Sequence, residues 1–245
     1  MNPNVAFATA LRVLTQLRRD PRTIALIVGV PTLLVVLLRF IFDDQDEIFD
    51  RIGGPLLGIF PFVSMFVVTT VTMLRERVTG TLERLMTLPL AKLDILAGYA
   101  MAFALLAVVQ ASVVSLVAFG LLDLRVEGSK VLVVALAVAN ATLGMALGLF
   151  TSAFARTEFQ AVQFLPAIVF PQMLLCGLIV AREDMATFLQ WISNALPLTY
   201  AYDALARVTA GDDLGARFAL DVTVTLGAAV LALVLGALTL RRRTA

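Results

Sequence analysis

The charged segment 75–90, RERVTGTLERLMTLPL, holds the residue types best suited to binding a partner or passing force. Gly80 can cap a short helix, and Glu83 would take its third position, facing the positive end of the helix dipole. The spacing predicts a short amphipathic helix that either transmits motion from a docked soluble protein or only anchors the loop at the membrane surface. The residues of its apolar face are Leu82, Leu85, Met86 and Pro89.

Several kinds of chemistry are excluded by composition. The sequence has no histidine and one cysteine, Cys176. A disulfide within the chain is impossible, the usual zinc, haem and copper sites lose their commonest ligands, and histidine-based acid–base catalysis is excluded. No G-x-x-x-x-G-K-[ST] phosphate loop occurs, so the chain alone is not expected to hydrolyse ATP. We expect no catalytic site and no cofactor in this chain.

Isolated polar residues interrupt the apolar runs. Each could line a substrate path, although such groups more often hydrogen-bond a neighbouring helix. The middle of every run is uncharged, which argues against a proton relay or an ion-coupled pump. The candidates for the path are Gln110, Ser115, Asn140, Gln163 and Gln172.

The elements that position these residues are long apolar runs. Sixty per cent of residues are hydrophobic and 15% are charged, and the mean hydropathy is +0.94. About 20 apolar residues cross a bilayer as a helix, whereas barrel strands alternate over about 10 residues. We therefore predict an all-α polytopic membrane protein with six transmembrane helices in one domain, residues 1–245. The runs are Ile24–Phe42, Gly53–Leu74, Ile95–Leu122, Val131–Phe154, Ala161–Val180 and Ala219–Leu240.

The distribution of charge predicts the orientation. With the N-terminus in the cytoplasm, 12 of the 19 basic residues fall inside and 13 of the 18 acidic residues fall outside. Lys and Arg set orientation by the positive-inside rule. Both termini are therefore expected to be cytoplasmic.

Shorter elements flank the runs. Asn4–Arg19 is expected to form an amphipathic helix at the membrane surface, the alternative being a solvated basic tail. Phe7, Ala10, Leu11 and Leu14 would form its apolar face, with Arg12, Gln16 and Arg19 roughly opposite. Asp20-Pro21 provides a break and a helix start.

The link before the last run contains two further short helices. Met185–Leu196 and Tyr200–Thr209 are predicted as outer helices separated by Pro197. Pro31, Pro166 and Pro171 should kink their helices. The small-residue spacing at Gly144 and Gly148 allows close helix approach, either within the chain or between two copies.

Two separated motifs carry a family resemblance. The segment R-E-R-x-x-G-T-L-E-R-L-x-x-x-P-L, between the second and third runs, resembles the signature of type-2 ABC export permeases, the drug- and polysaccharide-exporter class. The region before the last run is also similar, and the likeness covers essentially the whole chain. Its matching residues are Cys176-Gly177-Leu178, Trp191-Ile192-Ser193-Asn194, Leu196-Pro197-Leu198-Thr199-Tyr200 and Asp203-Ala204-Leu205.

The drug-resistance branch, typified by daunorubicin exporters, is the nearest likeness. Those relatives carry prolines soon after the C-G-L stretch, whereas residues 179–184 here contain none. The turn between the fifth run and the outer helices is therefore expected to differ.

The resemblance implies a half-transporter of the bacterial plasma membrane. Two permease copies, identical or closely paralogous, would face each other, and two cytoplasmic ATPase subunits that bind ATP and Mg would dock below them. No nucleic acid is expected as a partner, and membrane lipid surrounds the spans. The residues implied in ATPase coupling are Arg75, Glu76, Arg77, Gly80, Thr81, Leu82, Glu83, Arg84, Leu85, Met86 and Pro89. Those near an outer gate are Trp191, Asn194, Pro197, Thr199 and Tyr200.

The resulting hypothesis is a permease subunit that moves a hydrophobic or amphipathic compound outward with energy from a separate ATPase. Apolar faces with few polar groups suit such a cargo better than a sugar chain. Three alternatives stay open: an exporter of lipid-linked polysaccharide or teichoic acid, a membrane sensor or scaffold that recruits an ATPase without transport, and an intramembrane enzyme. The enzyme has little support, because no paired carboxylates or nucleophile–base set lies at membrane depth.

Overall fold

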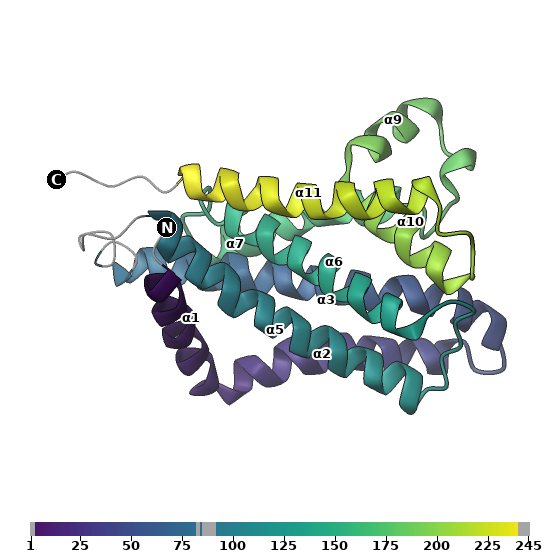
Figure 1. Ribbon diagram of the computed structural model, residues 1–245, viewed down its shortest axis with the longest axis horizontal. Helices are drawn as coiled ribbons and strands as arrows, with labels where there is room; N and C mark the ends of the chain where they lie inside the picture. Colours follow the sequence, from purple (N-terminus) through teal and green to yellow (C-terminus); the bar gives the residue numbers. More distant parts are fainter. Residues whose placement is uncertain (1–2, 82–83, 85–91, 240–245) are drawn as a thin grey trace.

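The computed structural model describes residues 3–81, 84 and 92–239, and these form helices joined by turns. The long helices run side by side and form an elongated bundle (Figure 1). The elements are α1 Pro3–Arg18, α2 Pro21–Ile41, α3 Asp46–Val78, α5 Lys92–Gly120, α6 Lys130–Thr151, α7 Glu158–Phe164, the π-helical turn η1 Leu165–Val169, α8 Phe170–Leu175, the short 3-10 turn η2 Arg182–Asp184, α9 Thr187–Ala195, α10 Pro197–Thr209 and α11 Ala216–Thr239.

Five helices of the described chain are long and apolar enough to cross a bilayer. They are α2, α3, α5, α6 and α11, and they coincide with five of the six predicted runs. The helix start expected at Asp20-Pro21 is also present. The Asp20 side chain accepts a bond from the Thr23 N–H at 3.2 Å and Pro21 is the first residue of α2.

The fifth predicted run, Ala161–Val180, is not a single α-helix. It is divided into α7, η1 and α8, and the chain leaves the helical conformation after Leu175. Pro166 lies in the π-helical turn and Pro171 follows the first residue of α8. Because proline removes a backbone donor and clashes with the preceding turn, a π-turn is a physical solution at this place. The six-span count is therefore not confirmed as six continuous helices.

The centre of the bundle is the contact between α3 and α6. Gly144 lies so close to α3 that an added Cβ would collide with the backbone of Phe62, and one at Gly148 would collide with Thr69 and Phe66. Thr69 Oγ1 also donates a bond of 3.3 Å to the Met145 carbonyl. The Gly144/Gly148 spacing thus serves packing within the chain, one of the two uses the sequence left open.

Helix α1 crosses one end of the bundle and packs on α5 (Figure 1). A Cβ at Gly98 of α5 would collide with Thr9 and the Ala6 carbonyl, so the two backbones approach closely. The expected helix is present, and two residues of the apolar face predicted for the membrane surface are not packed in the bundle. Phe7 and Leu11 are 62% and 56% exposed. The residues that face the bundle are Ala6, Thr9, Ala10, Val13 and Leu17.

The two short helices predicted before the last span are α9 and α10, and Pro197 is the first residue of α10. Helix α10 packs against α3, α6 and α11, whereas α9 projects from the bundle (Figure 1). Both lie toward the end opposite α1. That first end gathers α1, the last turns of α3, the start of α5 and the end of α11.

Candidate functional site

The end of the bundle at α1 contains the base of the charged segment. Helix α3 ends at Val78, and Gly80 then adopts a positive φ of 72°. A left-handed glycine is the usual way to stop a helix, because it avoids the strain of a side chain. The Gly80 carbonyl accepts a bond from the Arg84 N–H at 3.0 Å, a spacing that fits the start of a new helical turn. Thr81 follows, with its hydroxyl 3.1 Å from that of Thr79.

Five of the implied coupling residues lie outside the described part of the chain. They are Leu82, Glu83, Leu85, Met86 and Pro89. The predicted helix between α3 and α5 therefore stays a prediction, and the geometry of the site is that of the residues around it.

A three-helix contact joins both sides of that segment to α1. Arg12 of α1 forms an ion pair of 3.5 Å with Glu76 of α3 and donates a hydrogen bond to the Tyr99 hydroxyl of α5. Its guanidinium also lies over the Tyr99 ring, 5.5 Å from the centroid. Glu76 is 4% exposed and Tyr99 is fully buried, so little water competes with these contacts. We call Arg12, Glu76 and Tyr99 the Arg12 node.

A second link joins α3 to α7. The Arg75 Nε and Nη2 donate bonds of 2.7 and 3.0 Å to the two carboxylate oxygens of Glu158. This bidentate arrangement is a pair of charge-assisted hydrogen bonds with a fixed geometry. Both side chains are more than half exposed, so the pair itself contributes little to stability.

Among the described residues, no hydrogen bond joins any two of the five path candidates. Gln110 is buried and donates a bond of 2.7 Å from Nε2 to the Ile27 carbonyl, which joins α5 to α2. Gln172 bonds the Ile168 carbonyl in its own segment. Ser115 and Asn140 are buried, with no partner for the Ser115 hydroxyl or for either side-chain polar atom of Asn140. Gln163 lies on the exposed face of α7.

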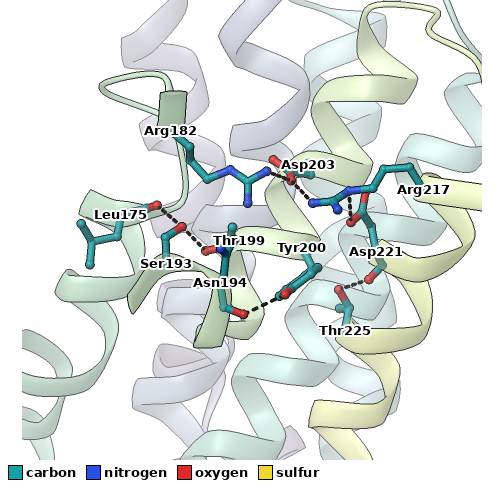
Figure 2. A network of polar contacts seen from close by, with 10 residues as sticks. All are labelled: Leu175, Arg182, Ser193, Asn194, Thr199, Tyr200, Asp203, Arg217, Asp221 and Thr225. Carbon is teal, nitrogen blue, oxygen red and sulfur yellow. Dashed lines mark hydrogen bonds and ion pairs between the residues drawn. The ribbon is translucent and has the colours of Figure 1, made fainter. Parts of the chain in front are cut away.

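The opposite end of the bundle carries a polar network around α10 (Figure 2). Arg182 of η2 lies 2.7 Å from Asp203 of α10, and Arg217 of α11 reaches Asp203 at 3.8 Å and Asp221 at 3.5 Å. Burial raises the pKa of Asp203 to about 6, although the two guanidiniums oppose the rise. The network ties the turn after α8 to both α10 and α11.

The outer gate candidates lie around the junction of α9 and α10. Thr199 is buried, with its hydroxyl 3.1 Å from that of Ser193, which in turn donates to the Leu175 carbonyl at 2.8 Å (Figure 2). The Tyr200 hydroxyl donates to the Asn194 carbonyl at 2.7 Å. Trp191 is 75% exposed on α9 and takes no part in these contacts. Asn194, Thr199 and Tyr200 therefore belong to a hydrogen-bonded junction between α9 and α10, whereas Trp191 lies on the exposed side of α9.

The sequence analysis missed the partners of these residues. Arg12 was placed on the polar face of α1, yet it reaches two other helices. Glu158, Tyr99 and Asp203 were not singled out as site residues. Their partners lie 14 to 87 residues away in the chain, and only a folded structure brings them together. In the described residues, no group of His, Cys, Asp or Glu side chains could hold a metal ion.

The helical bundle and its apolar surface define a polytopic membrane protein. The family model for the ABC-2 type transporter matches residues 5–209. The chain therefore belongs to the ABC-2 type transporter family, the membrane permeases of type 2.

Curated relatives agree with this family. ABC transporter G family member 20 of Dictyostelium discoideum is 28% identical over 66% of this chain and 22% of its own length. The probable multidrug ABC transporter permease YbhR of Escherichia coli (strain K12) is 26% identical over 62% of this chain and 42% of its own length. The chain thus spans less than half the length of these relatives.

Proposed function

We propose that this chain is the permease subunit of an ATP-driven exporter that moves a hydrophobic or amphipathic compound outward. The observation that supports this best is the Arg12 node. The segment between α3 and α5 is the part that the resemblance assigns to the ATPase, and the node fastens both of its neighbouring helices to α1. A displacement of the segment would therefore be transmitted to α1, α3 and α5 together.

The energy must come from a partner, because the sequence contains no phosphate-binding loop. ATP-driven closure of two cytoplasmic ATPase subunits would displace the segment 79–91. The bundle would then move between inward-open and outward-open arrangements, and the cargo would bias that equilibrium by its different affinity for the two.

The assembly and its orientation belong to the same proposal. Two copies, identical or closely paralogous, face each other in the bacterial plasma membrane with both termini in the cytoplasm. The broken segment of α7, η1 and α8 makes the sixth crossing. In support, α7 follows α6 at the same end of the bundle as α1, and α8 contacts α9 and α10 toward the other end.

The direct test is co-expression and co-purification with a candidate ABC ATPase, followed by ATPase assays in lipid vesicles with a panel of compounds. Compound-stimulated ATP hydrolysis and outward transport are expected. Recovery of the complex without any transport would support the recruiting scaffold instead. Accumulation of solute by the chain alone would contradict the proposal.

Variants of the segment test the coupling role. Glu83→Ala and Arg84→Ala should leave membrane insertion intact and weaken ATPase recovery or compound-stimulated hydrolysis. Arg125→Ala is a matched control, since it removes an exposed charge in the loop between α5 and α6. This loop lies at the end of the bundle opposite α1 (Figure 1). Unchanged complex recovery and transport in both segment variants would remove the coupling assignment.

A further inference from the structure

A groove of about 510 Å³ lies between α2, α3 and α8, and the site residues described above account for almost none of it. Its walls are mainly aliphatic and aromatic side chains, with Thr23, Ser64 and Thr72 as the neutral polar positions. The apolar lining includes Leu26, Val30, Val67, Phe170 and Met173. Such a lining favours a hydrophobic ligand over water or a sugar.

The groove is long and carries charge at one end. Its lining follows α3 from Phe60 to Arg75, which corresponds to about 22 Å at the rise of an α-helix. Arg75 is the one charged residue among the described residues that line it. An extended apolar groove that ends at a single guanidinium is complementary to one hydrocarbon chain with an anionic head group.

The guanidinium already binds an anion of the required kind. Glu158 occupies both donors of Arg75 in a bidentate pair. A guanidinium binds a carboxylate or a phosphate through the same planar fork, so a ligand head group can replace the Glu158 side chain. Glu158 is 56% exposed and can remain hydrated as a free carboxylate after it is displaced.

We propose that the groove between α2, α3 and α8 binds a single-chain amphiphile with an anionic head group, which takes the place of Glu158 on Arg75. This names the class of cargo and rests on the proposed export function. Since Arg75 belongs to α3 and Glu158 to α7, binding of the ligand opens the link between these helices. Binding of a ligand in the groove would thereby change the contacts of Arg75, at the start of the charged segment 75–90.

Binding can be measured on the full chain in phosphatidylcholine nanodiscs, without ATPase or ATP. Radiolabelled hexadecanoate is the probe, and the competitors are hexadecyl phosphate, hexadecyltrimethylammonium and monohexadecanoylglycerol. Both anions should compete at least about tenfold better than the cation or the neutral lipid, as expected for a charged hydrogen bond. Equal competition by all four would overturn the proposal.

Variants separate the groove from general surface charge. Arg75→Gln should weaken hexadecanoate binding about tenfold or more, and Glu158→Gln should tighten it, because the competing carboxylate is gone. Arg22→Gln is the matched control: this exposed arginine on α2 lies near the same end but does not line the groove. Equal loss in Arg22→Gln and Arg75→Gln, or weaker binding in Glu158→Gln, would contradict the proposal.

A third variant tests whether the apolar walls hold the chain. Val30→Trp fills the groove from α2 and should weaken binding of hexadecanoate and of monohexadecanoylglycerol alike. A second copy of the protein is the competing occupant. If cysteines at Val30 and Phe170 cross-link two copies equally with and without hexadecanoate, the groove is an interface between copies and the proposal is wrong.

The outcome is distinguishable from that of the export proposal. ATPase-coupled transport of other compounds with no hexadecanoate binding would remove only the groove assignment. Anion-selective binding in a chain that recruits no ATPase would remove only the exporter.

Discussion

Arg12 of α1 and Glu76 of α3 form an ion pair of 3.5 Å although 64 residues separate them in the chain. Glu76 is 4% exposed, whereas the Arg12 side chain is 34% exposed. The Glu76 carboxylate lies inside the bundle, and the Arg12 guanidinium covers it on the side of the surface. This relationship makes α1 part of the bundle rather than a helix that only rests on the membrane.

Removal of Arg12 should therefore destabilise the protein. Arg12→Gln leaves the buried Glu76 carboxylate without its cation, and we expect a loss on the order of 1–3 kcal/mol in the free energy of unfolding. Thermal unfolding in nanodiscs measures this. The double variant Arg12→Gln/Glu76→Gln should lose less than the sum of the two single variants, because the two residues share one interaction.

The control for this prediction is Arg19→Gln, which removes an exposed charge just after α1. It should leave the unfolding temperature nearly unchanged. Strictly additive effects in the Arg12 and Glu76 cycle would show that the ion pair does not couple the helices.

The close contact between α3 and α6 makes a second prediction. Gly144→Ala places a methyl group against the Phe62 backbone, where no flexible side chain can move away. We expect destabilisation of about 1–3 kcal/mol, the usual range for overpacking. Gly227→Ala is the matched control on α11, since nothing lies within 4 Å of its added Cβ. Equal unfolding temperatures for the two variants would contradict the packing.

The raised pKa of Asp203 makes stability depend on pH. The folded pKa is about 6, above the ordinary value of 3.8, so the folded state holds the proton more tightly than the unfolded chain. The stability that Asp203 contributes is complete below pH 3.8 and is lost as pH rises through about 6. The unfolding temperature of wild type should fall between pH 5 and 7 relative to that of Asp203→Asn. A parallel pH dependence in both proteins would mean that Asp203 does not titrate in this range.

The route of the broken segment can be followed with single cysteines. In a Cys176→Ser background, Arg156→Cys precedes α7 and Trp191→Cys lies on α9. If residues 158–175 cross the bilayer, an impermeant maleimide added to whole cells should label Trp191→Cys and not Arg156→Cys. Asp44→Cys, in the turn between α2 and α3, is the control and should be labelled like Trp191→Cys. Labelling of Arg156→Cys and Trp191→Cys from the same side would leave five crossings.

Local and periodic features could be predicted well from the sequence. Five of the apolar runs are helices of spanning length, since a bilayer requires that length and composition. The start of α2 at Asp20-Pro21 follows from chemistry within a few residues, whereas α10 begins at Pro197, three residues before the predicted start at Tyr200. The likeness at the charged segment and before the last span correctly indicated the family.

Contacts between distant segments could not be predicted. Arg12 reaches Tyr99 and Arg75 reaches Glu158 across 87 and 83 residues, and no local pattern encodes such pairs. The side of α1 that packs on the bundle could not be predicted either: Ala6 and Thr9 lie against Gly98, while the larger Phe7 stays exposed. Close backbone approach favours small side chains, and the apolar pattern within α1 does not indicate which helix it packs against.

The missing side chain at Gly98 has a mechanical consequence. It lets the backbone of α1 lie directly against that of α5, and Arg12 forms a second contact between α1 and its neighbours. Two separate contacts restrict the rotation of α1 relative to α5, which a single contact would allow. A displacement of α1, α3 or α5 at this end is therefore transmitted to the other two helices. The close contact that makes this possible depends on Gly98, the one residue type without a Cβ.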